Sequence, residues 1–92
     1  MIHLQVNPGS GIPIYRQVVD QIRQYVDSEL LSAGTELPSV GNMATSLGVN
    51  PAAVARAYTE LEQEDIVEMN VQKWGQVNFL ISRIVHFFSN GE

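Results

Sequence analysis

Three polar side chains in the middle of the chain have the types and positions needed to bind an anion. Ser39 and Asn50 each precede a segment in which apolar residues recur at helical spacing, and both residue types favour the N-cap position. The first turn of a helix presents amide groups without partners, so a capped start also suits a phosphate. Arg56 lies in the second of these segments and adds a positive charge. This pattern indicates a phosphate-contacting surface.

The sequence offers little support for catalysis or for metal binding. The chain has no cysteine, and its two histidines, His3 and His86, are far apart, so we expect no metal site. Carboxylates such as Glu60 and Glu64 are typical of a charged helix face. No serine, histidine and aspartate set and no glycine-rich phosphate loop stands out. We therefore expect no catalytic residues, no enzyme activity and no cofactor.

The net charge is unusual for a protein that contacts a polyanion. Five Lys and Arg residues stand against ten Asp and Glu residues, which gives a net charge of −5. Non-specific affinity for DNA depends on cations that displace counterions from phosphates. The acidic residues gather after Arg56, at Glu60, Glu62, Glu64, Asp65 and Glu68. The opposite end of this segment can therefore be locally neutral or positive.

Length and hydropathy indicate one small globular domain. The 92 residues with 45% apolar content can form a single core, and we expect no effector domain. The first residues lack the charged start and the apolar run of a signal peptide. No stretch approaches the roughly 20 apolar residues of a membrane span. We therefore expect a cytoplasmic protein that does not contact a membrane.

Helical periodicity predicts three helices that position these side chains. The first spans residues 13–32, with Gly34 just past its end. The second spans residues 40–47. The third begins at Pro51, where a missing N–H has no cost in the first turn. Only residues 48–50 remain between the last two helices, which is the tight turn of a helix-turn-helix.

Towards both ends of the chain, apolar residues recur at every second position instead of at helical spacing, which predicts strands there. Residues 2–6 alternate, which indicates a first strand or an ordered arm. Apolar residues alternate again in 67–71 and 77–81, which predicts a β-hairpin with its turn at residues 73–76. The fold class is therefore α+β, and residues 1–81 are predicted to form a winged helix-turn-helix of three helices and a C-terminal hairpin.

Residues 82–92 form an apolar tail with two open interpretations. Ile84, Val85 and Phe88 fit a helical stripe, whereas Val85 and Phe87 are also compatible with a continued strand. On an isolated monomer these side chains would form an apolar patch. The tail is therefore expected either to mediate dimerisation or to pack within one chain.

Several blocks at consistent spacing resemble the N-terminal winged-helix domain of the GntR family of bacterial transcription regulators, and most of all its YtrA-like subgroup. The blocks span residues 12–17, 37–40, 56–58 and 60–62. The resemblance implies a homodimer that binds a palindromic operator in double-stranded DNA. The third helix would enter the major groove and the hairpin would approach the minor groove. In this family a C-terminal domain binds a small effector, and no such site is evident here.

Some positions depart from the family pattern where DNA contacts are expected. Gly41 and Asn42 stand where the family usually has Arg and Glu. Ala53 stands where a threonine is usual, and Asp65 replaces a glycine at the end of the third helix. The hairpin turn retains one basic residue, Lys73. The predicted DNA surface therefore has fewer basic residues than the family pattern, whereas the apolar residues expected in the core are retained.

The predicted DNA-binding residues come from the starts of two helices, the third helix and the hairpin turn: Ser39, Asn50, Pro51, Ala53, Arg56 and Lys73. Each polar member has a second interpretation. Ser39 and Asn50 can be caps alone, Arg56 can pair with Glu60 four residues later, and Lys73 can simply solubilise a turn.

The aromatic residues also have two interpretations each. Tyr15, Tyr25 and Tyr58 lie at helical spacings and are predicted to be core or dimer contacts. Trp74, in the hairpin turn, either marks a binding surface or packs over the sheet.

Two functions from different classes follow from these patterns. The first is a GntR-like DNA-binding transcriptional regulator without an effector domain. The alternative is a winged-helix interaction module that has lost DNA binding and acts through dimerisation. The net charge of −5, Gly41 and the apolar tail favour the alternative, whereas the matched blocks favour the first.

Overall fold

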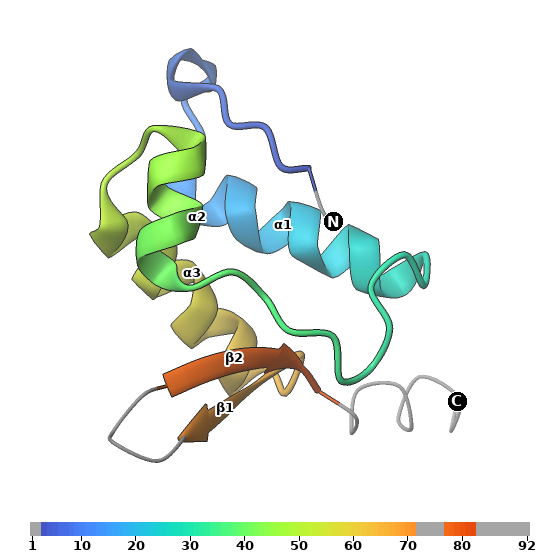
Figure 1. Cartoon of the computed structure of the whole chain (residues 1–92). Coiled ribbons are helices and arrows are strands. Elements are labelled where there is room, and N and C mark those ends of the chain that lie inside the picture. Colours follow the sequence, from blue (N-terminus) through green and yellow to red (C-terminus); the bar gives the residue numbers. More distant parts are fainter. Residues whose placement is uncertain (1–2, 72–76, 83–92) are drawn as a thin grey trace.

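Three α-helices precede a two-stranded hairpin in the computed structural model, which describes residues 3–71 and 77–82. The elements in chain order are the 3-10 helix η1 (Pro8–Ser10), α1 (Ile14–Asp27), α2 (Val40–Leu47), α3 (Pro51–Gln63), β1 (Val67–Val71) and β2 (Val77–Ile81). Figure 1 shows α3 running from the short loop after α2 down to the hairpin. The predicted α+β winged helix is thus confirmed.

Side-chain caps fix where α2 and α3 begin. The Oγ of Ser39 accepts a hydrogen bond from the N–H of Asn42 at 3.1 Å. The Oδ1 of Asn50 accepts one from the N–H of Ala52 at 2.8 Å, and Pro51 occupies the first position of α3. These contacts satisfy amides that have no partner within the helix. Both helix starts therefore agree with the prediction.

The first helix is shorter than the predicted range of 13–32. Glu29 adopts a left-handed φ of 64°, and the N–H of Leu30 donates to the carbonyl of Tyr25 at 2.9 Å. This pattern is a Schellman motif, which ends α1 at Asp27. The loop that follows buries Leu31 but leaves Leu30 70% exposed. The apolar spacing continued past the true end because the loop also contributes to the core.

The N-terminal segment is an ordered arm, and no strand forms within its described residues. Gln21 of α1 contacts it twice: its Oε1 accepts from the N–H of Gln5 at 3.0 Å, and its Nε2 donates to the carbonyl of Gln5 at 2.6 Å. Gln17 contacts the N–H and the carbonyl of Asn7 in the same way. Side-chain amides therefore satisfy the backbone groups that a neighbouring strand would otherwise pair.

The hairpin is extended by the loop that leads into α2. Val67 of β1 lies opposite Ile81 of β2 in the antiparallel register. On the other edge of β2, the N–H of Leu37 donates to the carbonyl of Phe79 and the N–H of Gly34 donates to that of Ile81, both at 2.8 Å. Gly34 has a φ of 88° and turns this loop. The prediction that it caps the first helix is therefore wrong, because α1 already ends at Asp27. The loop is thereby tied to the hairpin.

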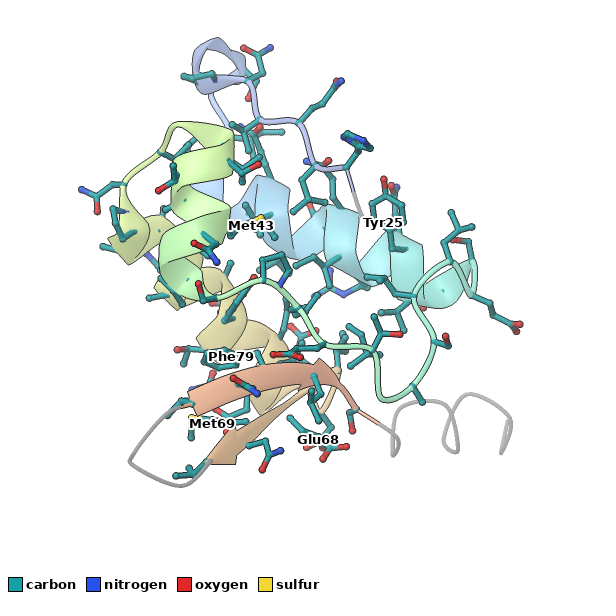
Figure 2. The ribbon with its side chains drawn as sticks, viewed as in Figure 1. Tyr25, Met43, Glu68, Met69 and Phe79 are labelled. Carbon is teal, nitrogen blue, oxygen red and sulfur yellow. The ribbon has the colours of Figure 1, made fainter. Side chains whose placement is uncertain are left out.

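Tyr58 lies at the centre of the core and joins α3 to the loop and the hairpin. Its side chain is fully buried, and its ring meets Phe79 edge to face with centroids 4.9 Å apart. Figure 2 labels Phe79 on β2. The hydroxyl donates to the carbonyl of Pro38 at 2.7 Å. Burial raises the pKa of the Tyr58 hydroxyl far above its ordinary value. The other large, fully buried side chains are Ile22, Leu61, Ile81, Val18, Val19, Val54 and Val67.

The raised pKa of Tyr58 predicts a loss of stability in alkali. Below the ordinary value of 10.0 the hydroxyl is protonated in both states, and above it only the unfolded chain loses the proton. The free energy of unfolding should therefore fall as pH rises beyond that value. Tyr58→Phe should weaken this dependence and, at neutral pH, lower the free energy of unfolding by about 1 kcal/mol because the Pro38 carbonyl loses its donor. Urea unfolding at neutral pH and above the ordinary pKa of 10.0 tests this. An equal fall in the free energy of unfolding with rising pH in Tyr58→Phe and in the wild type would contradict it.

The end of α3 contains a backbone conformation that favours glycine. Asp65 adopts a φ of 62°, and the N–H of Ile66 donates to the carbonyl of Leu61 at 2.9 Å. This is the same Schellman geometry as at the end of α1, and its left-handed position is most often glycine.

Asp65→Gly should raise the free energy of unfolding by about 1 kcal/mol, because glycine adopts this conformation without steric cost. The matched control is Asp65→Ala, which removes the charge but retains a Cβ that disfavours the left-handed conformation. Urea unfolding of the three proteins gives the comparison. Equal stabilisation by Ala and Gly would mean that relief of acidic repulsion, and not backbone conformation, is the cause.

Candidate nucleic-acid interface

The predicted DNA-binding residues that the structure describes divide into two groups. Asn50, Pro51, Ala53 and Arg56 lie together in the first turns of α3, and all except the half-buried Ala53 are exposed. Ser39 is also exposed, but it caps the far end of α2. A helix of that length spans about 12 Å at 1.5 Å per residue. The structure therefore brings four of these residues together and sets Ser39 apart.

Charge is unevenly distributed along α3. From Leu37 to Thr59 the sequence contains a single charged residue, Arg56. The acidic residues occupy the last turns of α3 and the segment after it, next to the hairpin (Figure 1). The positive end of the helix dipole also lies at the N-terminus of α3. The exposed start of α3 is therefore locally positive, although the whole chain carries a net charge of −5.

Arg56 stacks on an aromatic ring. Its guanidinium carbon lies 3.8 Å from the ring centroid of Tyr15, a half-buried residue in the first turn of α1. Within residues 3–71 and 77–82, Arg56 forms no ion pair and no side-chain hydrogen bond. The predicted alternative, an ion pair with Glu60, is therefore wrong. The edge of the guanidinium, with its N–H donors, has no acceptor in that part of the chain.

The other two described arginines are paired with carboxylates. Arg23 contacts Glu64 at 2.6 Å and Asp20 at 3.2 Å, and Arg16 lies 3.9 Å from Asp20. The hydrogen bond to Glu64 raises the pKa of Arg23 above its ordinary value. Acidic neighbours thus offset the charge of both residues. Arg56 differs from them in keeping an uncompensated positive charge at the surface.

The amides at the start of α3 are already engaged. Pro51 has no N–H, the N–H of Ala52 donates to the side chain of Asn50, and the N–H of Ala53 donates to the carbonyl of Asn50 at 3.0 Å. A phosphate at this position would therefore be contacted by the side-chain NH2 of Asn50, whose oxygen serves as the cap. Backbone amides of this first turn contribute less than the sequence pattern suggested.

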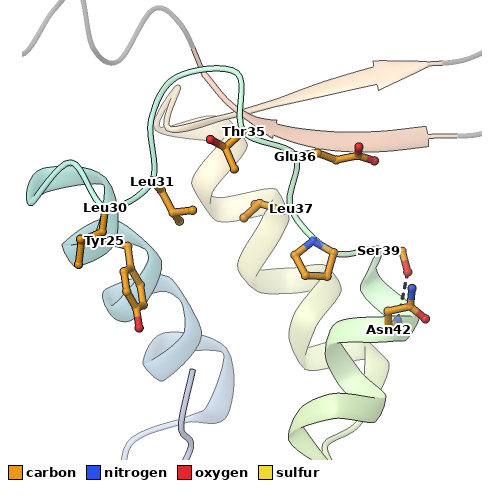
Figure 3. Close-up of a pocket in the computed structure, with 9 residues that line it drawn as sticks. Tyr25, Leu30, Leu31, Thr35, Glu36, Leu37, Ser39 and Asn42 are labelled. Carbon is orange, nitrogen blue, oxygen red and sulfur yellow. Dashed lines mark hydrogen bonds between the residues drawn. The ribbon is translucent and has the colours of Figure 1, made fainter. Parts of the chain in front are cut away.

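A separate hollow lies between the end of α1 and the start of α2 (Figure 3). Its volume is about 680 Å³, and Leu30, Leu31 and Leu37 form much of its apolar lining. The capping pair of Ser39 and Asn42 lies at its edge. The sequence did not indicate this hollow, because residues 28–32 were predicted to be helical. In the structure they belong to the loop whose Leu30 and Leu31 line the hollow.

Several sequence predictions concern positions outside the described residues. These are the Lys73 contact, the two interpretations of Trp74, and the helix, strand or dimer contact in residues 83–92. Of the tail, only Ser82 is described; it is buried, and its N–H donates to the carbonyl of Ile66 at 2.8 Å.

The described residues contain no group of His, Cys, Asp and Glu that could hold a metal ion. In the same part of the chain, no helix has the length and apolar character needed to cross a bilayer. Neither finding adds a second candidate site to the surface around Arg56.

Comparison with known proteins identifies the family. The family of bacterial regulatory proteins named gntR matches residues 14–73, more than half of the chain. The chain belongs to the GntR family. Its fold and its sequence blocks thus have one explanation.

Individual relatives place this GntR chain in the YtrA-like subgroup. It is 40% identical over 65 residues to the transcriptional repressor YtrA of Bacillus subtilis, which covers 71% of this chain and 50% of that protein. It is 40% identical over 80 residues to the regulator Rv1152 of Mycobacterium tuberculosis, covering 87% and 63%. The chain thus spans between half and two thirds of these relatives.

A solved structure supports the same assignment. The GntR-family transcription factor YtrA from Sulfolobus acidocaldarius superposes with a TM-score of 0.74 at 28% identity, over 97% of this chain and 98% of that one. The predicted resemblance to YtrA-like transcriptional regulators is confirmed. Tyr15, whose ring contacts Arg56, was not among the DNA-binding residues predicted from the sequence.

Proposed function

We propose that this GntR domain binds a palindromic operator in double-stranded DNA as a cytoplasmic homodimer and thereby regulates transcription. In this proposal α3 enters the major groove and the hairpin approaches the minor groove. The observation that supports it is the exposed guanidinium of Arg56 on the N-terminal half of α3, which forms no ion pair with any residue in 3–71 or 77–82. No acidic residue lies between Leu37 and Thr59 to repel a phosphate backbone.

Each predicted residue takes a distinct part in this proposal. Arg56 supplies charge and N–H donors to a base edge or phosphate, and the side-chain NH2 of Asn50 donates to a phosphate. Pro51 and Ala53 give the start of α3 a small surface that permits close approach to the groove. Ser39 contacts the backbone on the other side of α2, and Lys73 approaches the minor groove.

One observation favours the alternative, a dimerisation module without DNA affinity. Gly41 is exposed on α2, where the family usually has an arginine, and no atom lies within 4 Å of the position of an added Cβ. Its φ is not positive, so neither packing nor backbone conformation requires glycine. The absence of a cation here therefore weakens the DNA surface without serving the fold.

Arg56→Ala should weaken DNA binding by roughly 1 to 3 kcal/mol per contact, because it removes the charge and the donors. Fluorescence anisotropy with a pool of random-core palindromic duplexes, at low and near-physiological salt, measures this. For the wild-type dimer the logarithmic salt slope should be about −4 to −5. Arg23→Ala is the charge-matched control, since Arg23 contacts Asp20 and Glu64 away from this surface.

The pattern of binding separates the two functions. Saturable binding that is retained in Arg23→Ala and measurably weakened in Arg56→Ala would support the DNA-binding function. Equal losses in both variants would mean that net charge alone is responsible. No binding by the wild type, even at low salt, would leave the dimerisation module as the function.

Gly41→Arg should strengthen DNA binding by roughly three- to tenfold at low salt and steepen the salt slope by about one unit per protomer. The side chain has open space, so the fold should tolerate it. Gly41→Ala is the control, because it adds helix propensity without charge. If Ala and Arg raise the affinity equally, helix stability is the cause and α2 does not face the phosphate backbone.

A further inference from the structure

The ring of Tyr15 covers one face of the Arg56 guanidinium, and this contact joins the start of α1 to the middle of α3. We propose that Tyr15 is a positioning residue for DNA binding: it holds Arg56 in place and keeps its charge from pairing with Glu60. The inference rests on the proposed DNA-binding function.

The ring is a fixed platform for the guanidinium. Tyr15 is half-buried and packs against the core, so the protein interior determines where its ring lies. Arg56 is exposed, and an arginine side chain free in water samples many rotamers. The separation of 3.8 Å between the Arg56 guanidinium carbon and the ring centroid is within the range of a favourable cation–π contact. The ring therefore restricts Arg56 before any partner binds.

The contact leaves the chemistry of Arg56 available. Stacking covers a face of the planar guanidinium, whereas its N–H donors lie around the edge. No residue in 3–71 or 77–82 accepts from these donors. The ring is also neutral, so it does not offset the positive charge. A carboxylate partner would both occupy the donors and cancel the charge.

Glu60 is the carboxylate that would compete for Arg56. It lies four residues later on α3, the spacing at which opposite charges on a helix meet. The pair of Arg16 and Asp20, with the same spacing on α1, approaches to 3.9 Å. Arg56 and Glu60 form no such pair in the structure, and Tyr15 is the partner that Arg56 contacts instead. Removal of the ring should therefore permit pairing with Glu60.

Tyr15→Leu tests the proposal, because leucine retains apolar packing but has no aromatic face. It should weaken binding to the random-core duplex pool by about three- to tenfold, the range expected when one arginine side chain must be ordered on binding. Tyr15→Phe retains the face and should bind like the wild type. Glu60→Gln should raise the affinity more in Tyr15→Leu than in the wild type, because only without the ring can the carboxylate pair with Arg56.

Two further measurements exclude a purely structural effect. In an Arg56→Ala background, Tyr15→Leu should cause no additional loss, because its role acts through Arg56. In the free protein, the side-chain NH resonance of Arg56 should show a ring-current shift in the wild type and in Tyr15→Phe, and lose it in Tyr15→Leu. Circular dichroism and thermal unfolding confirm that each variant is folded.

The outcomes separate this proposal from the DNA-binding function. Wild-type affinity in Tyr15→Leu, together with loss in Arg56→Ala, would overturn the role of Tyr15 and leave the function intact. An equal loss from Tyr15→Leu in the Arg56→Ala background would show that the ring acts independently of Arg56. An equal effect of Glu60→Gln in Tyr15→Leu and in the wild type would overturn the competition with Glu60. Absence of binding by the wild type would overturn the function, and the positioning role with it.

Discussion

The buried side chain of Tyr58 connects the parts of the molecule on which the proposed DNA surface depends. Its ring contacts Phe79 of the hairpin, and its hydroxyl holds the carbonyl of Pro38 directly before the Ser39 cap. α3 therefore fixes both the hairpin and the start of α2 through one residue. Both contacts are made by a buried side chain, and loss of the hydroxyl would leave the Pro38 carbonyl without this donor.

Separation of charge along α3 reconciles an acidic chain with the proposed binding to DNA. Acidic residues gather where α3 meets the hairpin, whereas the start of the helix carries only Arg56. Electrostatic potential at short range is governed by the nearest charges, since solvent and salt screen distant ones. Arg23 contributes to the separation because it binds Asp20 and Glu64 on the acidic side of the molecule. The net charge of the chain is therefore a poor guide to the charge of this surface.

The local sequence predicted the elements and their ends wherever these depend on residues close together in the chain, as helix caps and strand alternation do. Ser39 and Asn50 cap their helices as predicted, and the period of two gave the hairpin its bounds. The end of α1 was not predicted, because Glu29 adopts a conformation more typical of glycine and Leu31 enters the core from a loop. Periodicity detects burial and cannot tell a helix from the loop that continues its apolar face.

The sequence by itself determined the family, the three helices, the hairpin and the position of Arg56 on α3. Only the tertiary structure decided which residue Arg56 contacts. Sequence spacing favours an ion pair of Arg56 with Glu60, four residues later, because it describes only neighbours along one helix. The packing of α1 against α3 instead brings the ring of Tyr15 beneath the guanidinium. Contacts between residues far apart in the chain depend on how the helices pack, and no local rule specifies that.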